Sequence, residues 1–155
     1  MQWGAEMEQL LRALMVWASA QTGLPMTDEL PEIRITNRCE IERIFYSDMS
    51  KSCEDTALRI QAIYDPRVAR MLLPETWSEK NIYDISMLVH EVVHHLQAKN
   101  GQTPETVGCT GRDIEKPAYD AQIAWLEAAG LDAFETMGIN GLAYRLLTIC
   151  ETAYM

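Results

Sequence analysis

The chain has 155 residues, of which 48% are hydrophobic and 23% charged, and its formal net charge is −10 at pH 7. A globular chain of this length buries roughly 70% of its unfolded surface, so one compact domain with a single core is expected. A net negative charge is repelled by nucleic acid and by anionic membranes, which argues against both as partners. No run reaches the roughly 18 uninterrupted apolar residues that a membrane-spanning helix needs.

The first expected element is a helix over residues 1–22. Its apolar residues recur at alternating spacings of four and three, which is typical of an amphipathic helix that packs on a core. They are Trp3, Met7, Leu10, Leu14 and Trp17. Gly23-Leu24-Pro25 is expected to end this helix. Glu6 and Glu8 precede the most apolar part, which is the wrong flank for a signal peptide.

Residues 31–73 are expected to form a small sheet region. Pro31 to Thr36 alternates apolar and polar residues as a short strand does, and a helical turn is expected from Glu40 to Tyr46. A second strand is indicated by the alternation of Leu58, Ile60, Ala62 and Tyr64. The turn Asp65-Pro66-Arg67 follows, and Val68 to Leu73 is expected to return as the partner strand. A β-hairpin therefore leads into the next helix.

The next segment predicts a buried helix of about five turns, which ends at the stop signal Asn100-Gly101. Its apolar residues are Ile82, Ile85, Met87, Leu88, Val89, Val92, Val93 and Leu96. All three histidines of the chain lie in this helix, within His90-Glu91-Val92-Val93-His94-His95. Such a concentration of histidines disfavours the alternative that they are ordinary helix residues.

His90 and His94 are four positions apart, so both rings lie on the same helix face and can hold one cation. Glu91 would lie beside that cation, where its carboxylate can take a proton from a metal-bound water and pass it to a leaving amine. The spacing therefore predicts a catalytic zinc site, with Glu91 as general base.

A catalytic zinc site has three protein ligands and one open position, so a third ligand is required. Glu115 is the preferred candidate, 21 residues after His94 and at the head of a second apolar-periodic segment that extends to Gly130. That segment is expected to be a helix packed across the first, so that residues 82–129 form the metal-site helix pair. An acid in the first turn, facing the helix dipole, is the structural alternative for Glu115. The competing ligands are Asp113, Asp120 and Cys109.

The segment His90–His94 followed by Glu115-Lys116-Pro117-Ala118 resembles the HExxH…ExxA arrangement of gluzincin-type zinc metallopeptidases, especially the small bacterial minigluzincins. Tyr119, Gln122 and Trp125-Leu126 are similar to a group of bacterial proteins in which HELVHH-Q is followed by ExEAY and a Trp-Leu pair. The resemblance covers residues 57–129 well and implies a Zn²⁺ ion bound by His90, His94 and Glu115, with Glu91 as general base.

Pro117 departs from this family pattern, since relatives usually carry a helix-favouring residue there. Proline is tolerated only in the first turn of a helix, so Glu115 is expected at or just before the helix start. The resemblance also implies a sheet whose edge strand binds the substrate as an added antiparallel strand. Residues 58–64 are the candidate edge, and the alternative is that both hairpin strands only cover the core.

A hydrolase of this kind needs a donor for the oxyanion that forms on the attacked carbonyl. The candidate donors are Tyr119, Tyr144, Arg145 and His95. Each also has a structural explanation: half-buried helix aromatics for the two tyrosines, a solvated helix charge for Arg145, and a surface neighbour of the motif for His95. The sequence leaves this choice open.

The four cysteines contain no CxxC pair, so a structural zinc site built from cysteines alone is not expected. They are Cys39, Cys53, Cys109 and Cys150. If they form disulfides, the protein is expected to be exported, to the periplasm or beyond; otherwise a cytoplasmic location is expected.

Residues 131–155 are expected to be helical, with a break near Gly138 to Gly141, and to close the core behind the zinc helices. The expected packing stripe is Leu131, Phe134, Met137, Leu142, Leu146 and Ile149. Residues 1–155 thus predict one helix-rich α+β domain, with a small, mostly antiparallel sheet over the metal-site helix pair. The expected function is zinc-dependent hydrolysis of a peptide or protein substrate. The alternative is a zinc-stabilised binding or regulatory module without catalysis.

Overall fold

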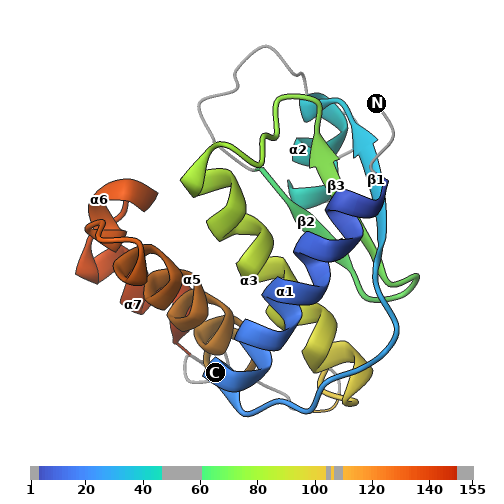
Figure 1. The fold of residues 1–155 in the computed structure, drawn as a ribbon. Helices are drawn as coiled ribbons and strands as arrows, with labels where there is room; N and C mark the ends of the chain where they lie inside the picture. The colour runs from blue at the N-terminus through green and yellow to red at the C-terminus, as the bar shows by residue number, and fades with distance from the viewer. Residues whose placement is uncertain (1–3, 47–60, 104–105, 107–109, 150–155) are drawn as a thin grey trace.

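The structure, a computed structural model, describes residues 4–46, 61–103, 106 and 110–149. Its elements are α1 (Ala5–Thr22), β1 (Glu32–Thr36), α2 (Arg38–Tyr46), β2 (Ile63–Asp65), β3 (Arg70–Pro74), α3 (Ile82–Lys99), the π-helical turn η1 (Thr110–Glu115), α5 (Lys116–Ala128), α6 (Ala133–Met137) and α7 (Gly141–Thr148). The predicted helix-rich α+β class is confirmed (Figure 1).

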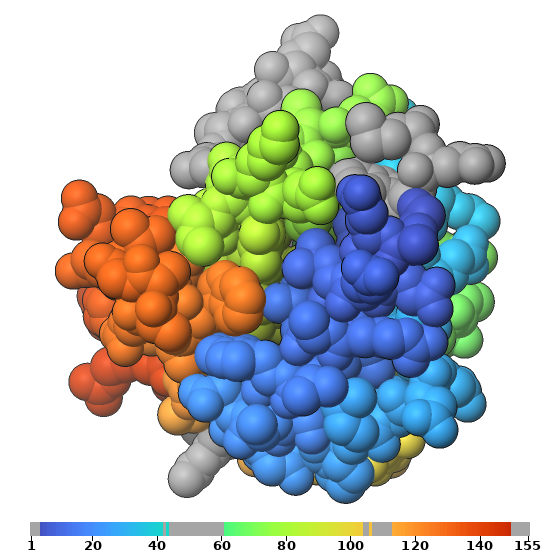
Figure 2. Space-filling model, in the orientation of Figure 1, coloured from blue at the N-terminus to red at the C-terminus, as the bar shows by residue number. Residues whose placement is uncertain are grey.

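The helix α3 lies at the centre of the fold, with the sheet and α2 on one side and α5, α6 and α7 on the other (Figure 1). Its residues Leu88, Val89, Val92, Val93 and Leu96 are fully buried. A helix that is apolar on most of its circumference must be covered on several sides, which is why α1 crosses it as well. In the space-filling view, α1 covers the C-terminal part of α3 on this face, while the N-terminal part of α3 is visible between α1 and the C-terminal helices (Figure 2).

The packing face of α1 follows from its sequence, although it is shifted from the predicted stripe. Met7 and Leu14 are buried as expected, whereas Leu10 and Trp17 lie half-buried at the margin. The fully buried positions also include Leu11, Met15 and Ala18. The helix ends as predicted at Gly23, whose φ of 78° is a left-handed conformation that glycine adopts without strain. Trp3 lies outside the described residues.

The sheet has the strand order β1-β3-β2. The predicted hairpin is confirmed for its described part, because β2 pairs antiparallel with β3 from Ile63↔Leu72 onward. The expectation of a mostly antiparallel sheet is wrong: β1 runs parallel to β3, and this ladder is the longer of the two. A parallel neighbour needs a long crossover connection, which the segment between β1 and β2 supplies through α2.

The strand β2 lies at one edge of the described sheet, as predicted for residues 58–64. Leu58 and Ile60 lie outside the described residues, and Ala62 precedes the strand. The use of this edge by a substrate stays a prediction.

The C-terminal helices α6 and α7 form on either side of the predicted break. The predicted packing stripe is wrong for α7, because Leu142 and Leu146 are 67% and 60% exposed. The physical reason is that α7 packs mainly against η1, whereas α1 packs against α3 and α5, so the outer face of α7 is left uncovered by the described residues. The helix α7 is held at its polar side instead, where the Tyr144 hydroxyl donates a hydrogen bond to Asp120.

No helix among the described residues is both long and apolar enough to span a membrane. Cys39 lies near the start of α2 and is disulfide-bonded. Cys53, Cys109 and Cys150 lie outside the described residues, so the pairing of the four and the compartment inferred from it stay predictions.

Candidate metal centre

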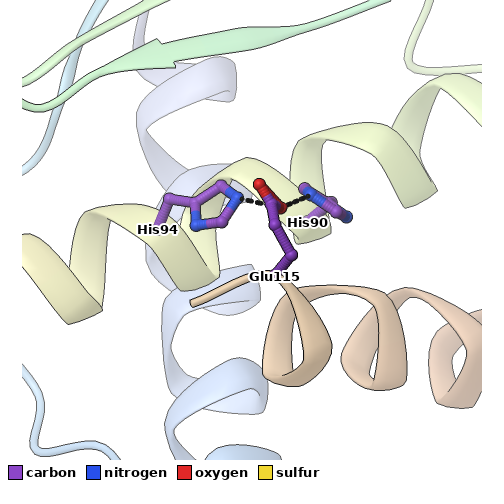
Figure 3. A group of neighbouring side chains, drawn as sticks. All are labelled: His90, His94 and Glu115. Atoms are coloured by element: carbon purple, nitrogen blue, oxygen red, sulfur yellow. Dashed lines mark hydrogen bonds and ion pairs between the residues drawn. The ribbon is translucent and has the colours of Figure 1, made fainter. Parts of the chain in front are cut away.

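The structure brings the three predicted metal ligands together. His90 and His94 lie one turn apart on α3, and Glu115 reaches them from the start of α5 (Figure 3). The carboxylate Oε1 atom of Glu115 lies 3.0 Å from Nε2 of His90 and 2.9 Å from Nε2 of His94. All three ligand atoms lie within 4.8 Å of one another.

The competing ligands for the third position do not join this group. Asp113 is exposed on η1, and Asp120 is engaged by Lys116 and Tyr144. Cys109 lies outside the described residues. Glu115 is therefore the third ligand that the described geometry favours.

The backbone around Glu115 explains how Pro117 is accommodated. Glu115 is the N-cap residue of α5, and the proline lies in the first turn, as its missing N–H requires. The preceding turn, η1, is π-helical, a conformation often found at functional sites. The proline position was predictable from the sequence, whereas the π-helical turn was not.

A buried glutamine orients each histidine ring. Gln97 donates from its Nε2 to the carbonyl oxygen of Ile114 at 2.9 Å, which leaves its Oε1 as the acceptor for Nδ1–H of His94 at 2.8 Å. Gln122 likewise donates to Ser86 Oγ at 3.2 Å, and its Oε1 accepts from Nδ1–H of His90 at 3.1 Å. Both rings therefore carry a proton on Nδ1 and turn their Nε2 atoms toward Glu115.

This hydrogen-bond pattern directs three acceptors at one point. Two Nε2 lone pairs and a carboxylate repel one another unless a cation lies between them, either two extra protons or a metal ion. The donor set of two imidazoles and one carboxylate is one of those that catalytic zinc sites use, and fixed Nδ1–H groups are typical of metal-binding histidines. His90, His94 and Glu115 would hold such an ion.

Residues 4–153 match the family described as "Domain of unknown function (DUF6647)". The chain belongs to this family. No curated protein and no solved structure matches the chain. The description of the DUF6647 family names no activity.

The electrostatics of this DUF6647 chain favour a cation at the centre. Burial would raise the pKa of Glu115, but hydrogen bonds from His90 and His94 and their charges hold that pKa well below its usual range. Burial would likewise lower the pKa of His94, but the bond to Glu115 and the charges of Glu91 and Glu115 outweigh it and raise the pKa to about 9. Both shifts have the same origin, the attraction between the Glu115 carboxylate and the imidazole rings.

Glu91 lies beside the three ligands and is 9% exposed. Burial is the largest influence on its pKa and raises it, and the charge of Glu115 acts in the same direction, against the two histidines. A carboxylate with a raised pKa is a stronger proton acceptor than an ordinary glutamate. Its placement matches the general-base role predicted from the sequence, and the role itself stays a prediction.

The four candidate oxyanion donors differ in their surroundings. His95 is fully buried, so the expectation of a surface residue is wrong. Its Nε2–H donates to the carbonyl oxygen of Glu29 at 2.7 Å, which leaves Nδ1 to accept from the Tyr64 hydroxyl at 2.8 Å. Tyr144 donates to Asp120, and Arg145 is exposed on α7.

Tyr119 is the candidate that lies at the centre. It follows Glu115 by one turn, and its ring contacts that of His90 edge-on, with centroids 4.5 Å apart. Burial, followed by the charges of Glu115 and Glu91, raises the pKa of its hydroxyl, which keeps the group protonated and able to donate. Sequence reasoning included Tyr119 but missed the roles of Gln97 and Gln122, since a buried glutamine has no distinctive spacing.

We expect Gln122→Leu to weaken zinc binding about 10- to 100-fold, because the His90 ring loses the acceptor that holds its orientation. Competition with a chromogenic chelator measures the affinity. Gln122→Glu keeps an acceptor oxygen in place and should bind zinc nearly as tightly as the wild type. Unchanged affinity in Gln122→Leu would show that the glutamine does not orient the ligand.

Proposed function

We propose that this chain is a zinc metallopeptidase that hydrolyses peptide bonds in a peptide or protein substrate. The observation that carries the proposal is the convergence of the His90 and His94 Nε2 atoms on Glu115, next to the buried carboxylate of Glu91. The resemblance of the HExxH…ExxA segments to gluzincins supports the same chemistry.

Zinc held by these residues would supply a water of pKa about 7 and a positive charge for the carbonyl oxygen of the substrate. Gln97 and Gln122 hold the two rings so that both Nε2 atoms face the same point. Glu91 accepts the proton of the attacking water and then delivers it to the leaving amine. The hydroxyl of Tyr119, whose ring contacts that of His90, would donate to the developing oxyanion.

Metal analysis together with a cleavage assay tests this proposal. Purified protein should contain one zinc per chain and cleave members of a mixed peptide library, as detected by mass spectrometry. Removal of the metal should stop cleavage, and added zinc should restore it. A zinc-loaded protein that cleaves no peptide bond would favour the alternative, a non-catalytic module stabilised by zinc.

Tyr119→Phe should lower kcat about 10²- to 10³-fold with little change in KM, because one donor to the transition state is removed while ground-state contacts remain. Steady-state kinetics on the best library peptide measure both constants. Tyr144→Phe removes a hydroxyl bonded to Asp120 and should leave kcat near the wild-type value. Equal losses in the two variants would argue against a donor role for Tyr119.

A further inference from the structure

A cavity of about 170 Å³ opens directly beside the candidate metal centre. His94 and Glu115 form the side of the cavity that it shares with the metal centre. The other walls come from β2 and the turn after it, from the C-terminal part of α3, and from η1. The apolar lining residues are Tyr64, Pro66, Ala98 and Ile114.

Among the described residues, the lining offers no partner for a charged group other than the two metal ligands. The remaining lining residues, Gln97, Gln102 and Thr103, are neutral. The amide of Gln97 is already used at both ends, by His94 and by the carbonyl oxygen of Ile114. A charged side chain placed here would lose its hydration without compensation, whereas an apolar one would gain by leaving water.

The size of the cavity limits what can enter it. Sites for drug-sized molecules measure about 300–1,000 Å³, so a cavity of about 170 Å³ is suited to a single side chain. Ala98 is important for this size, because it is the smallest lining residue and lies one turn after His94 on α3. A larger residue at this position would fill part of the cavity and leave the three ligand residues themselves unchanged.

We propose that this cavity is a specificity pocket for one uncharged aliphatic side chain of the substrate, adjacent to the bond that is cleaved. The inference rests on the proposed peptidase function, and it adds the class of substrate: peptides with a leucine-like residue next to the scissile bond.

Binding of simple hydroxamates to the zinc-loaded protein tests the pocket without requiring catalysis. Acetohydroxamate carries only the metal-binding group, and 4-methylpentanohydroxamate adds a branched alkyl chain. Isothermal titration calorimetry should show at least about tenfold tighter binding of the branched compound, since one extra apolar contact set in a pocket commonly gives 10- to 200-fold discrimination. Equal affinities, or no binding of either compound, would overturn the proposal.

Two variants change the cavity in opposite directions. Ala98→Leu should remove the preference for the branched compound and keep the affinity for acetohydroxamate. Gln102→Ala enlarges the cavity and should improve binding of 3-phenylpropanohydroxamate relative to the wild type. Ala128→Leu adds the same atoms at an exposed position of α5 and serves as the matched control. An Ala98→Leu protein that keeps the full preference would place the alkyl chain elsewhere.

Peptide profiling separates this proposal from the proposed function. If the wild type cleaves peptides without any preference for an aliphatic residue beside the scissile bond, the proposed role of the pocket is wrong and the peptidase function stands. If the hydroxamate preference is present and no peptide is cleaved, the pocket stands and the peptidase function is wrong.

Discussion

Glu91→Gln is expected to lower kcat about 10²- to 10⁴-fold while one zinc per chain stays bound. Glutamine has nearly the same shape as glutamate, but its amide cannot accept the proton of the attacking water. The metal should remain because Glu91 is not one of the three ligands, His90, His94 and Glu115. Zinc content by mass spectrometry and kcat on the same preparation provide the measurement.

The matched control is Glu79→Gln, which makes the same change at an exposed glutamate before α3. Its kcat and zinc content should equal those of the wild type. Full activity in Glu91→Gln would show that Glu91 is not the general base. Loss of zinc from this variant would show that Glu91 binds the ion or orients one of its ligands.

His94→Ala is expected to abolish stoichiometric zinc binding and, with it, peptide cleavage. A site with three protein ligands cannot lose one of them and retain tight binding. Asp113→Asn is the control, because Asp113 competes for the third position in the sequence and is exposed in the structure. This variant should keep both zinc and activity. A zinc-replete His94→Ala protein would show that the ion binds elsewhere.

Zinc binding at this site should also raise the thermal stability of the protein. At free zinc about 1,000-fold above its dissociation constant, binding stabilises the native state by about 4 kcal/mol. For a chain of this size that corresponds to a rise in Tm of about 8–16 °C. Chelation of the wild type should lower Tm by this amount, and His94→Ala should not respond to the chelator.

The metal-free protein should also show a pH dependence that zinc suppresses. Because the pKa of His94 is raised from 6.5 to about 9 on folding, its protonation stabilises the native state fully below pH 6.5. This contribution is lost as the pH rises to about 9. Tm of the metal-free protein should therefore fall over this interval, and zinc, which replaces the proton, should remove the slope. Identical slopes with and without zinc would argue against an ion at His94.

The parts of the fold predicted correctly were those with a local cause. The spacing of His90 and His94 follows from helix geometry, and the start of α5 follows from the restrictions that Pro117 places on a helix. The hairpin turn at Asp65 to Arg67 carries its own turn residues. In each case a few neighbouring residues determine the backbone, so the sequence was sufficient.

The features that were missed depend on contacts between distant segments. Nothing near Glu32 or Arg70 encodes that β1 and β3 pair in parallel, since that choice depends on the crossover between them. The pairing of Gln122 with His90 joins residues 32 positions apart. The exposure of Leu142 follows from the packing of α1, and not α7, against α3. Periodicity identifies an apolar face and does not specify its partner.

The buried ring of His95 connects α3 to two other parts of the chain. One ring nitrogen is bonded to the backbone of Glu29, between α1 and β1, and the other to the hydroxyl of Tyr64 on β2. Because the neighbouring His94 is a metal-ligand candidate and Tyr64 lines the adjacent cavity, both are tied to the same turn of α3. The cavity and the ligand set therefore form one preorganised unit, and a substrate that fits it would bind with little loss of conformational freedom in the protein.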